Sequence, residues 1–219
     1  MLHRIMINNQ EYVYDLTYKR MKSIRIKIDK GQIVVTCPYG TPKIEIETLI
    51  LKNADKLLKA MDQYESPYDI REGGYVDLFG QRYTLRFVDD GRLLVMREGQ
   101  QLIVHGNVST LNRYLFDELS NYINRRIYDY LPTFSNQLSF PEIEFKNYKS
   151  RWGSCYYERH KVTFNVKLIH LDQELIDYVV LHELCHFLVH NHSKAFYHEI
   201  YLRMPDYQMR VQKLRGIHL

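Results

Sequence analysis

Apolar and polar residues alternate along much of the first half of the chain, with the period of two that is typical of half-buried strands. Residues 23–29 read Ser-Ile-Arg-Ile-Lys-Ile-Asp, and a second alternating run covers 32–37 after a Lys-Gly turn. These two runs predict a hairpin. Short alternating runs recur from 75 to 105 between Asp-Gly and Glu-Gly turns, and they predict an antiparallel meander.

Helical spacing of apolar residues marks three other segments. A first helix is predicted over 43–61 and a second over 109–131, where Pro132 ends it. A third is predicted from Asp172, a favourable N-cap residue, to about Val189.

The last third of the chain also contains strand patterns. Residues 143–149 and 161–166 are strand-like, and Arg151–Cys155 between them is interpreted as a turn or loop. The whole pattern predicts an α+β fold. We expect a small antiparallel β-rich lobe with one helix over 1–107 and an α-rich part over 108–219.

Composition narrows the possible partners and the compartment. The net charge of +4, from 30 basic and 26 acidic residues, gives no support for a nucleic-acid partner or an anionic membrane surface. The three cysteines have no close pairing, which argues against a disulfide framework and favours a reducing cytoplasm. No apolar run of ~18 residues and no signal-peptide pattern is present, so we expect no membrane span.

The most informative motif is His-Glu-Leu-Cys-His at 182–186, an H-E-x-x-H sequence in the third predicted helix. Histidines four residues apart lie on one face of a helix, so His182 and His186 can bind one metal ion. Glu183 is then placed to act as general base on a metal-bound water. The motif predicts a zinc hydrolase, in the first place a peptidase that acts on peptides or proteins. The oxyanion that develops on the substrate carbonyl would need a second electrophile beside zinc. Arg151 and Tyr197 are candidates for this role.

A third ligand must come from beyond the helix. In a continuous helix His190 would lie ~12 Å along the axis from His182, too far for one zinc ion. We therefore expect the helix to end and the chain to fold back. Asn191 is suited to this turn, because asparagine tolerates the left-handed conformation of a helix C-terminus. His192 is the favoured ligand, and Glu199 is the alternative in a His-His-Glu scheme. Ser193 is the expected cap of a following helix.

Several motifs together resemble a known family. Arg-Trp-Gly-Ser-Cys at 151–155, Asp-Tyr-Val-Val-Leu-His-Glu-Leu-Cys-His at 177–186 and Asn-His-Ser-x-x-Phe at 191–196 occur in this order. Together with Lys-Ser-Ile-Arg-Ile at 22–26, they resemble the YgjP-like, SprT-related metallopeptidases, which are zincins. The resemblance runs from about residue 20 to 215.

The resemblance implies a zincin-like catalytic part with an H-E-x-x-H active-site helix, preceded by a β-rich lobe. It implies Zn2+ bound by His182, His186 and His192, with Glu183 as general base. The family usually has Phe-Trp after the third histidine, where this chain has Phe196-Tyr197. We interpret that difference as a packing substitution.

Two other functions stay open. A metal-dependent nucleotide pyrophosphohydrolase has been proposed for such proteins, and a basic segment could bind the phosphates of a nucleotide. Its cations are Lys146, Lys149, Arg151, Arg159 and Lys161. Against this function, the chain has no glycine-rich phosphate loop. The third possibility is a non-catalytic binding module that zinc holds together.

Overall fold

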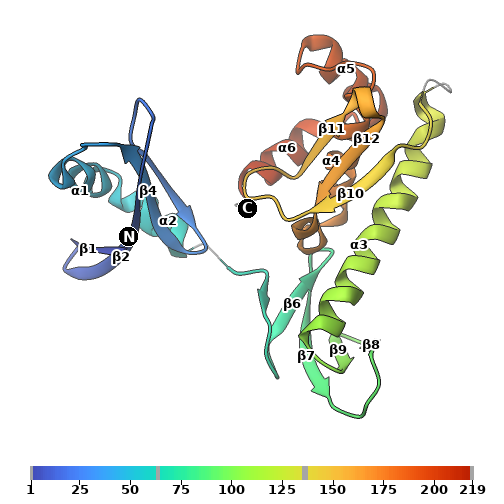
Figure 1. Cartoon of the computed structure of the whole chain (residues 1–219), viewed down its shortest axis with the longest axis horizontal. Helices are drawn as coiled ribbons and strands as arrows, with labels where there is room; N and C mark the ends of the chain where they lie inside the picture. The colour runs from blue at the N-terminus through green and yellow to red at the C-terminus, as the bar shows by residue number, and fades with distance from the viewer. Residues whose placement is uncertain (1, 63–64, 135–137, 218–219) are drawn as a thin grey trace. The chain divides into compact units, whose positions relative to one another are not determined.

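The chain forms two compact units, each built from strands and helices. The computed structural model describes residues 2–62, 65–134 and 138–217 (Figure 1). The units are Met1–Ser66 and Pro67–Ile217. Within the described residues there are six α-helices and three sheets, so the fold is α+β as expected. None of the helices in these ranges is long and apolar enough to cross a membrane.

The first unit is a four-stranded sheet with two short helices. The sheet has the order β1-β2-β4-β3. Its elements are β1 (Leu2–Ile7), β2 (Gln10–Lys19), β3 (Arg25–Asp29), β4 (Gln32–Pro38), α1 (Lys43–Lys52) and α2 (Ala54–Asp62). The antiparallel pairing of β3 with β4 confirms the predicted hairpin. The single helix expected over 43–61 is instead two helices, because the chain leaves helical geometry at Asn53, whose φ is −109°.

Parallel pairing in this unit was not predicted. Strand β2 lies parallel to β4, with Leu16 opposite Val35. The expectation of an antiparallel lobe is therefore wrong at this pairing. Both residues are buried in a core that also includes Ile33, Ile46 and Ile50.

A five-stranded sheet opens the second unit. Its order is β5-β6-β7-β9-β8. The strands are β5 (Tyr68–Asp69), β6 (Tyr75–Leu78), β7 (Gln81–Val88), β8 (Leu94–Glu98) and β9 (Gln101–His105). The meander prediction is wrong for β7 and β9, which pair in parallel. Residues 102–105 of β9 are all buried, so β9 takes an inner position, and the more exposed β8 lies at the edge.

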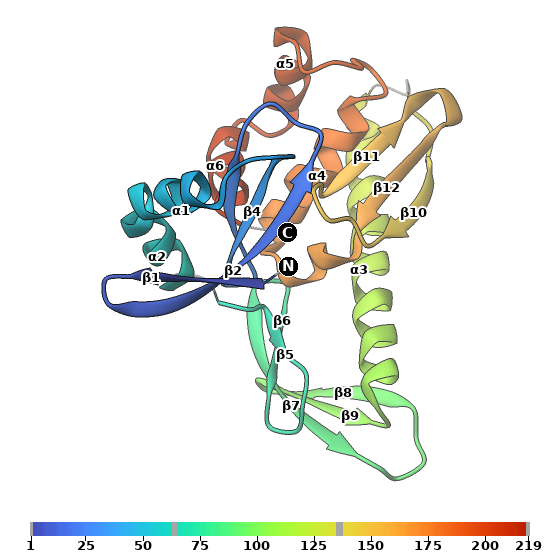
Figure 2. The ribbon, with the colours of Figure 1, turned by 60° about the vertical axis from the view of Figure 1, so that its left-hand side comes forward.

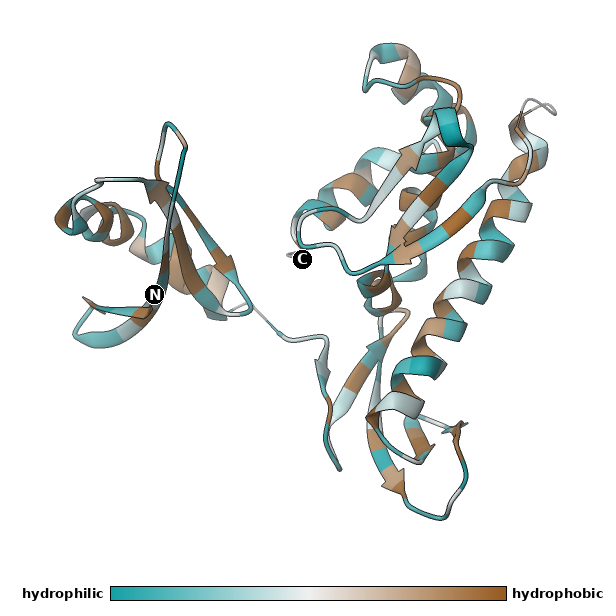
Figure 3. Cartoon of the chain, viewed as in Figure 1, coloured by the Kyte–Doolittle hydropathy of each residue, from teal (hydrophilic) through white to brown (hydrophobic). Residues whose placement is uncertain are grey.

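A long helix, α3 (Val108–Tyr130), packs on this sheet. The Asn107 side chain caps it by accepting from the N–H groups of Ser109 and Thr110. One face carries a buried apolar stripe, and Figure 3 shows how apolar and polar residues alternate along the helix. The stripe consists of Leu111, Leu115, Leu119, Ile123 and Ile127. The end of α3 at Tyr130, before Pro132, agrees with the prediction.

The rest of the second unit combines a three-stranded sheet with three helices. The sheet has the order β10-β12-β11 (Figure 2). Its strands are β10 (Glu142–Lys146), β11 (Gly153–Tyr156) and β12 (Lys161–Asn165), and the helices are α4 (Gln173–Cys185), α5 (Lys194–Arg203) and α6 (Tyr207–Arg215). The expected loop at 151–155 is thus largely strand β11. The expected lobe boundary at 107/108 falls between β9 and α3, inside this compact unit.

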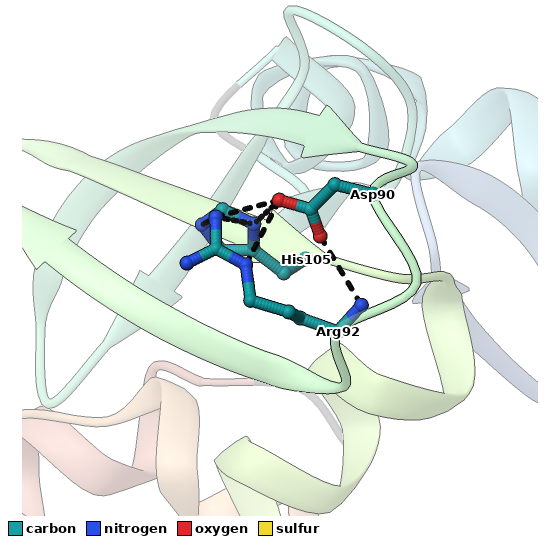
Figure 4. Close-up of polar contacts among 3 residues, drawn as sticks. All are labelled: Asp90, Arg92 and His105. Atoms are coloured by element: carbon teal, nitrogen blue, oxygen red, sulfur yellow. Dashed lines mark hydrogen bonds and ion pairs between the residues drawn. The ribbon is translucent and has the colours of Figure 1, made fainter.

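A charged cluster fixes the loop between β7 and β8 against β9 (Figure 4). Asp90 Oδ2 lies 2.6 Å from Arg92 Nη2 and 2.8 Å from Nδ1 of His105, the last residue of β9. The Arg92 guanidinium in first place, and His105 with it, hold the pKa of Asp90 well below its usual range. The contacts of Asp90 with Arg92 and His105 therefore stabilise the local fold.

Candidate functional site

The site begins at the C-terminal end of α4. This helix is held by buried apolar residues such as Ile176, Val179 and Val180. Its last turn carries His182 and Glu183 and is followed directly by His186 at the C-cap. The helix ends at Cys185, earlier than the predicted end near 189.

The turn after α4 brings a third histidine to the first two. One nitrogen atom each of His182, His186 and His192 lie within 4.8 Å of one another. Nε2 of His192 is 3.0 Å from Nε2 of His182. The left-handed conformation expected at Asn191 is wrong, since its φ is not positive. Instead its side-chain oxygen accepts a hydrogen bond from the N–H of Ser193. Ser193 stands at the N-cap position of α5 as expected, but its side chain makes no capping hydrogen bond.

Hydrogen bonds orient the two helical imidazoles. Nδ1 of His186 lies 3.2 Å from the carbonyl oxygen of Val189, and Nδ1 of His182 lies 3.2 Å from the Tyr178 hydroxyl. A carbonyl oxygen only accepts, so Nδ1 of His186 carries the proton and Nε2 keeps its lone pair. The Tyr178 hydroxyl can accept from His182 in the same way. Both rings can then present Nε2 to a metal ion.

The electrostatics of the pocket keep these rings neutral. Burial in first place, with the nearby charges of His186 and His192, lowers the pKa of His182 to about 3. Burial also lowers the pKa of His186. Metal ions bind neutral imidazole, so the donor set fits a divalent ion that prefers nitrogen ligands, such as zinc.

One aromatic ring packs against all three histidines. Phe196 of α5 is fully buried. Its ring centroid lies 4.9 Å from that of His182, 4.4 Å from that of His186 and 4.9 Å from that of His192. The packing of α5 therefore helps to set the position of His192 relative to α4.

Glu183 lies beside the histidines and is nearly enclosed. Its exposed fraction is 6%. Burial raises its pKa to about 8, against the backbone N–H of Cys155 and the charge of Arg151, which both act to lower it. A Cβ atom at Gly153 would lie 2.7 Å from Glu183 Oε1, so only glycine leaves this carboxylate its place.

Strand β11 runs along the site with one open edge. It pairs with β12 through one edge, toward which the Trp152 carbonyl points as it accepts from the Asn165 N–H. Backbone groups alternate in direction along a strand, so those of Gly153 and Cys155 point the other way. The Cys155 N–H indeed bonds to Glu183. Within the described residues no strand pairs with this second edge.

Of the three remaining predicted residues, two lie beside the site and the third is paired elsewhere. Arg151 and Tyr197 line one cavity of about 410 Å3 together with His182 and Glu183. Glu199, the alternative ligand, instead forms an ion pair with Arg203, with Oε2 2.7 Å from Nη1.

A neighbouring histidine makes other contacts, and two nearby cysteines stay protonated. His190 stacks on Tyr157 with ring centroids 3.6 Å apart, and its Nδ1 faces the carbonyl oxygen of His186 at 2.9 Å. Burial is the main cause that raises the pKa values of both Cys155 and Cys185 to about 12, so these thiols stay protonated near neutral pH.

Sequence reasoning missed two residues that shape this site. Tyr178 bonds to His182, and its position four residues earlier on the same helix face was a usable signal. Gly153 was seen in the motif at 151–155, but its close approach to Glu183 required the tertiary structure.

Two of the five cations in the basic segment considered for phosphate binding form ion pairs with glutamates. Nζ of Lys146 lies 3.2 Å from Glu144, and Nζ of Lys161 lies within 3.0 Å of both Glu142 and Glu144. Arg151 of the same segment is directed to the histidine site instead.

The chain is similar to one protein family and to two solved structures. The family model described as YgjP-like, metallopeptidase domain, matches residues 22–216. No curated protein matches the chain significantly. The crystal structure of the metallopeptidase zymogen of Methanocaldococcus jannaschii jannalysin is 26% identical, with a TM-score of 0.36, over 42% of this chain and 96% of that chain. The Pyrococcus abyssi abylysin zymogen is 16% identical, with a TM-score of 0.32, over 49% of this chain and 99% of that chain.

Proposed function

The chain belongs to the YgjP-like metallopeptidase family, as its motifs indicated, and we propose that it is a zinc-dependent peptidase. The observation that carries this proposal is the convergence of His182, His186 and His192 to within 4.8 Å, next to a buried glutamate. We assign the three histidines as the zinc ligands. Zinc, when bound, makes a water molecule acidic enough to be a nucleophile near neutral pH and polarises the substrate carbonyl.

Glu183 is the general base in this proposal. The Cys155 N–H fixes one end of the carboxylate, and this N–H and the charge of Arg151 both favour the ionised form, which can accept a proton from the attacking water. The same group can then pass the proton to the leaving amine. Arg151 and Tyr197 line the adjoining cavity, from which either could donate to the developing oxyanion.

The open edge of β11 supports a peptide as substrate. An extended peptide can add to an exposed strand edge through backbone hydrogen bonds, and the outward groups of Gly153 are placed for this. A peptide bound there would lie next to Glu183, because that edge already contacts its carboxylate. This arrangement would also orient the scissile carbonyl.

Metal analysis of the wild type and three variants tests the proposal. We expect near-stoichiometric zinc in the wild type and in Glu183→Gln, and loss of zinc in His192→Ala. The matched control is His190→Ala, which removes a neighbouring imidazole that already faces a backbone carbonyl and should keep its zinc. Digestion of a mixed peptide library by the wild type, but not by Glu183→Gln, would then establish the peptidase.

Other outcomes would favour other functions. Activity that depends on magnesium and on a nucleotide would favour the pyrophosphohydrolase. A Glu183→Gln protein that keeps both its zinc and its function would favour a non-catalytic module.

A further inference from the structure

The cavity beside Glu183 combines an apolar lining with two arginines. Its volume is about 410 Å3, and its floor includes His182 and Glu183. The apolar part of the wall is made by Trp152, Val179, Val211 and Leu214. Two guanidinium groups complete it, Arg151 from the segment before β11 and Arg215 from the end of α6.

Arg215 differs from two other basic residues of α6, both of which form ion pairs. Nε of Arg210 lies 2.9 Å from Asp206, and Nζ of Lys213 lies 2.6 Å from Glu174. Within the described part of the chain, Arg215 forms no ion pair with a carboxylate. Its charge acts instead on Tyr178, which lines the same cavity.

Arg151 is also without a carboxylate partner among the residues that the structure describes. Its guanidinium carbon lies 5.6 Å from the centre of the Tyr148 ring, and its charge acts on Glu183. Two unpaired cations at an apolar cavity leave room for an anion with an apolar stem, since each guanidinium can form paired hydrogen bonds with a carboxylate.

We propose that this cavity binds a carboxylate of the peptide substrate and makes Arg215 a specificity-determining residue. The carboxylate belongs either to an acidic side chain near the scissile bond or to the C-terminus of the peptide. In both cases the methylene groups next to it lie along the apolar wall. The inference rests on the proposed peptidase function, because the cavity opens onto Glu183.

A nucleotide fits this cavity less well. Its phosphates carry several negative charges, whereas the cavity offers two cations and also contains the carboxyl group of Glu183. The apolar wall would contribute nothing to a phosphate chain. We therefore favour the carboxylate, and pyrophosphate serves as the competing probe.

Binding to the full-length Glu183→Gln protein tests the cavity without turnover. Four fluorescent peptides of one sequence would carry Glu or Gln at a single position and end in a carboxylate or an amide. We expect peptides with the recognised carboxylate to bind about tenfold more tightly than the matched neutral peptides, as for one charge-assisted hydrogen bond. The Glu and Gln arms report on the side chain, and the acid and amide arms report on the C-terminus.

The decisive variant is Arg215→Gln in the same background, because Arg151 is also a candidate donor to the oxyanion. We expect it to abolish most of the tenfold preference, and Arg215→Lys to restore part of it. The control is Arg113→Gln, which removes an exposed guanidinium on α3 and should leave the preference unchanged.

The proposal is overturned if all four peptides bind equally, if none binds, or if the preference survives Arg215→Gln. Displacement of the peptides by pyrophosphate in an Arg215-dependent manner, without a carboxylate preference, would assign the cavity to phosphate instead. Hydrolysis of the same peptides by the wild type tests the peptidase separately. A carboxylate preference without hydrolysis would keep the cavity and refute the peptidase.

Discussion

The hydrogen bond between Tyr178 and His182 gives a sharp prediction for zinc affinity. Tyr178→Phe removes the hydroxyl that faces Nδ1 of His182 and leaves the aromatic packing in place. Loss of such a partner to a metal-binding histidine weakens affinity about 10–100-fold. The 3.2 Å distance is at the long end of the hydrogen-bond range, so we expect about tenfold, or ~1.4 kcal/mol.

Competition with a chromophoric chelator measures the dissociation constant of zinc for each protein. The matched control is Tyr122→Phe, which removes a half-buried hydroxyl that donates to Asp177 at 2.8 Å, away from the three histidines. That variant should lose about 1 kcal/mol in the free energy of unfolding but keep its zinc affinity. An unchanged dissociation constant in Tyr178→Phe, or an equal rise in Tyr122→Phe, would refute the reasoning.

Further predictions concern the packing, the carboxylate and the pH dependence of the fold. Phe196→Ala should lower the free energy of unfolding by about 3–5 kcal/mol in urea titrations, because it empties a fully buried site beneath the histidines. Gly153→Ala should reduce peptide hydrolysis at least ~10-fold with zinc retained, since its Cβ would displace Glu183; Ser154→Ala is the control and should stay active. Burial lowers the pKa of His170, so the unfolded chain binds that proton more readily and stability falls as the pH drops below about 6.5. His170→Gln should therefore show a smaller loss of unfolding free energy between about pH 7 and pH 5.

Helix positions were the most predictable part of the molecule. The stripe from Leu111 to Ile127 identified α3 because a helix buries every third or fourth residue on one face. The same geometry explains why His182 and His186 could be placed on one face of α4. Both inferences rest on spacing within one element, which the sequence contains directly.

Strand pairing was less predictable because it depends on partners far away in the chain. The parallel pairing of β7 with β9 follows from the burial of β9 on both faces, which alternation alone does not reveal. Residues 151–155 were interpreted as a turn or loop, and the glycine at 153 has low intrinsic strand propensity. Their strand conformation is fixed by pairing with β12, and that pairing brings the Cys155 N–H to Glu183.

The position of His192 illustrates how core packing completes the site. Sequence spacing favoured this residue, but the left-handed Asn191 that was expected to turn the chain is not used. In the structure α4 ends at Cys185, and the buried Phe196 ring brings the first turn of α5 under the imidazoles. The geometry of the three rings thus follows from the apolar core of the second unit. A zinc ion would then meet three imidazoles that already lie close together, so its binding should require little rearrangement of the backbone.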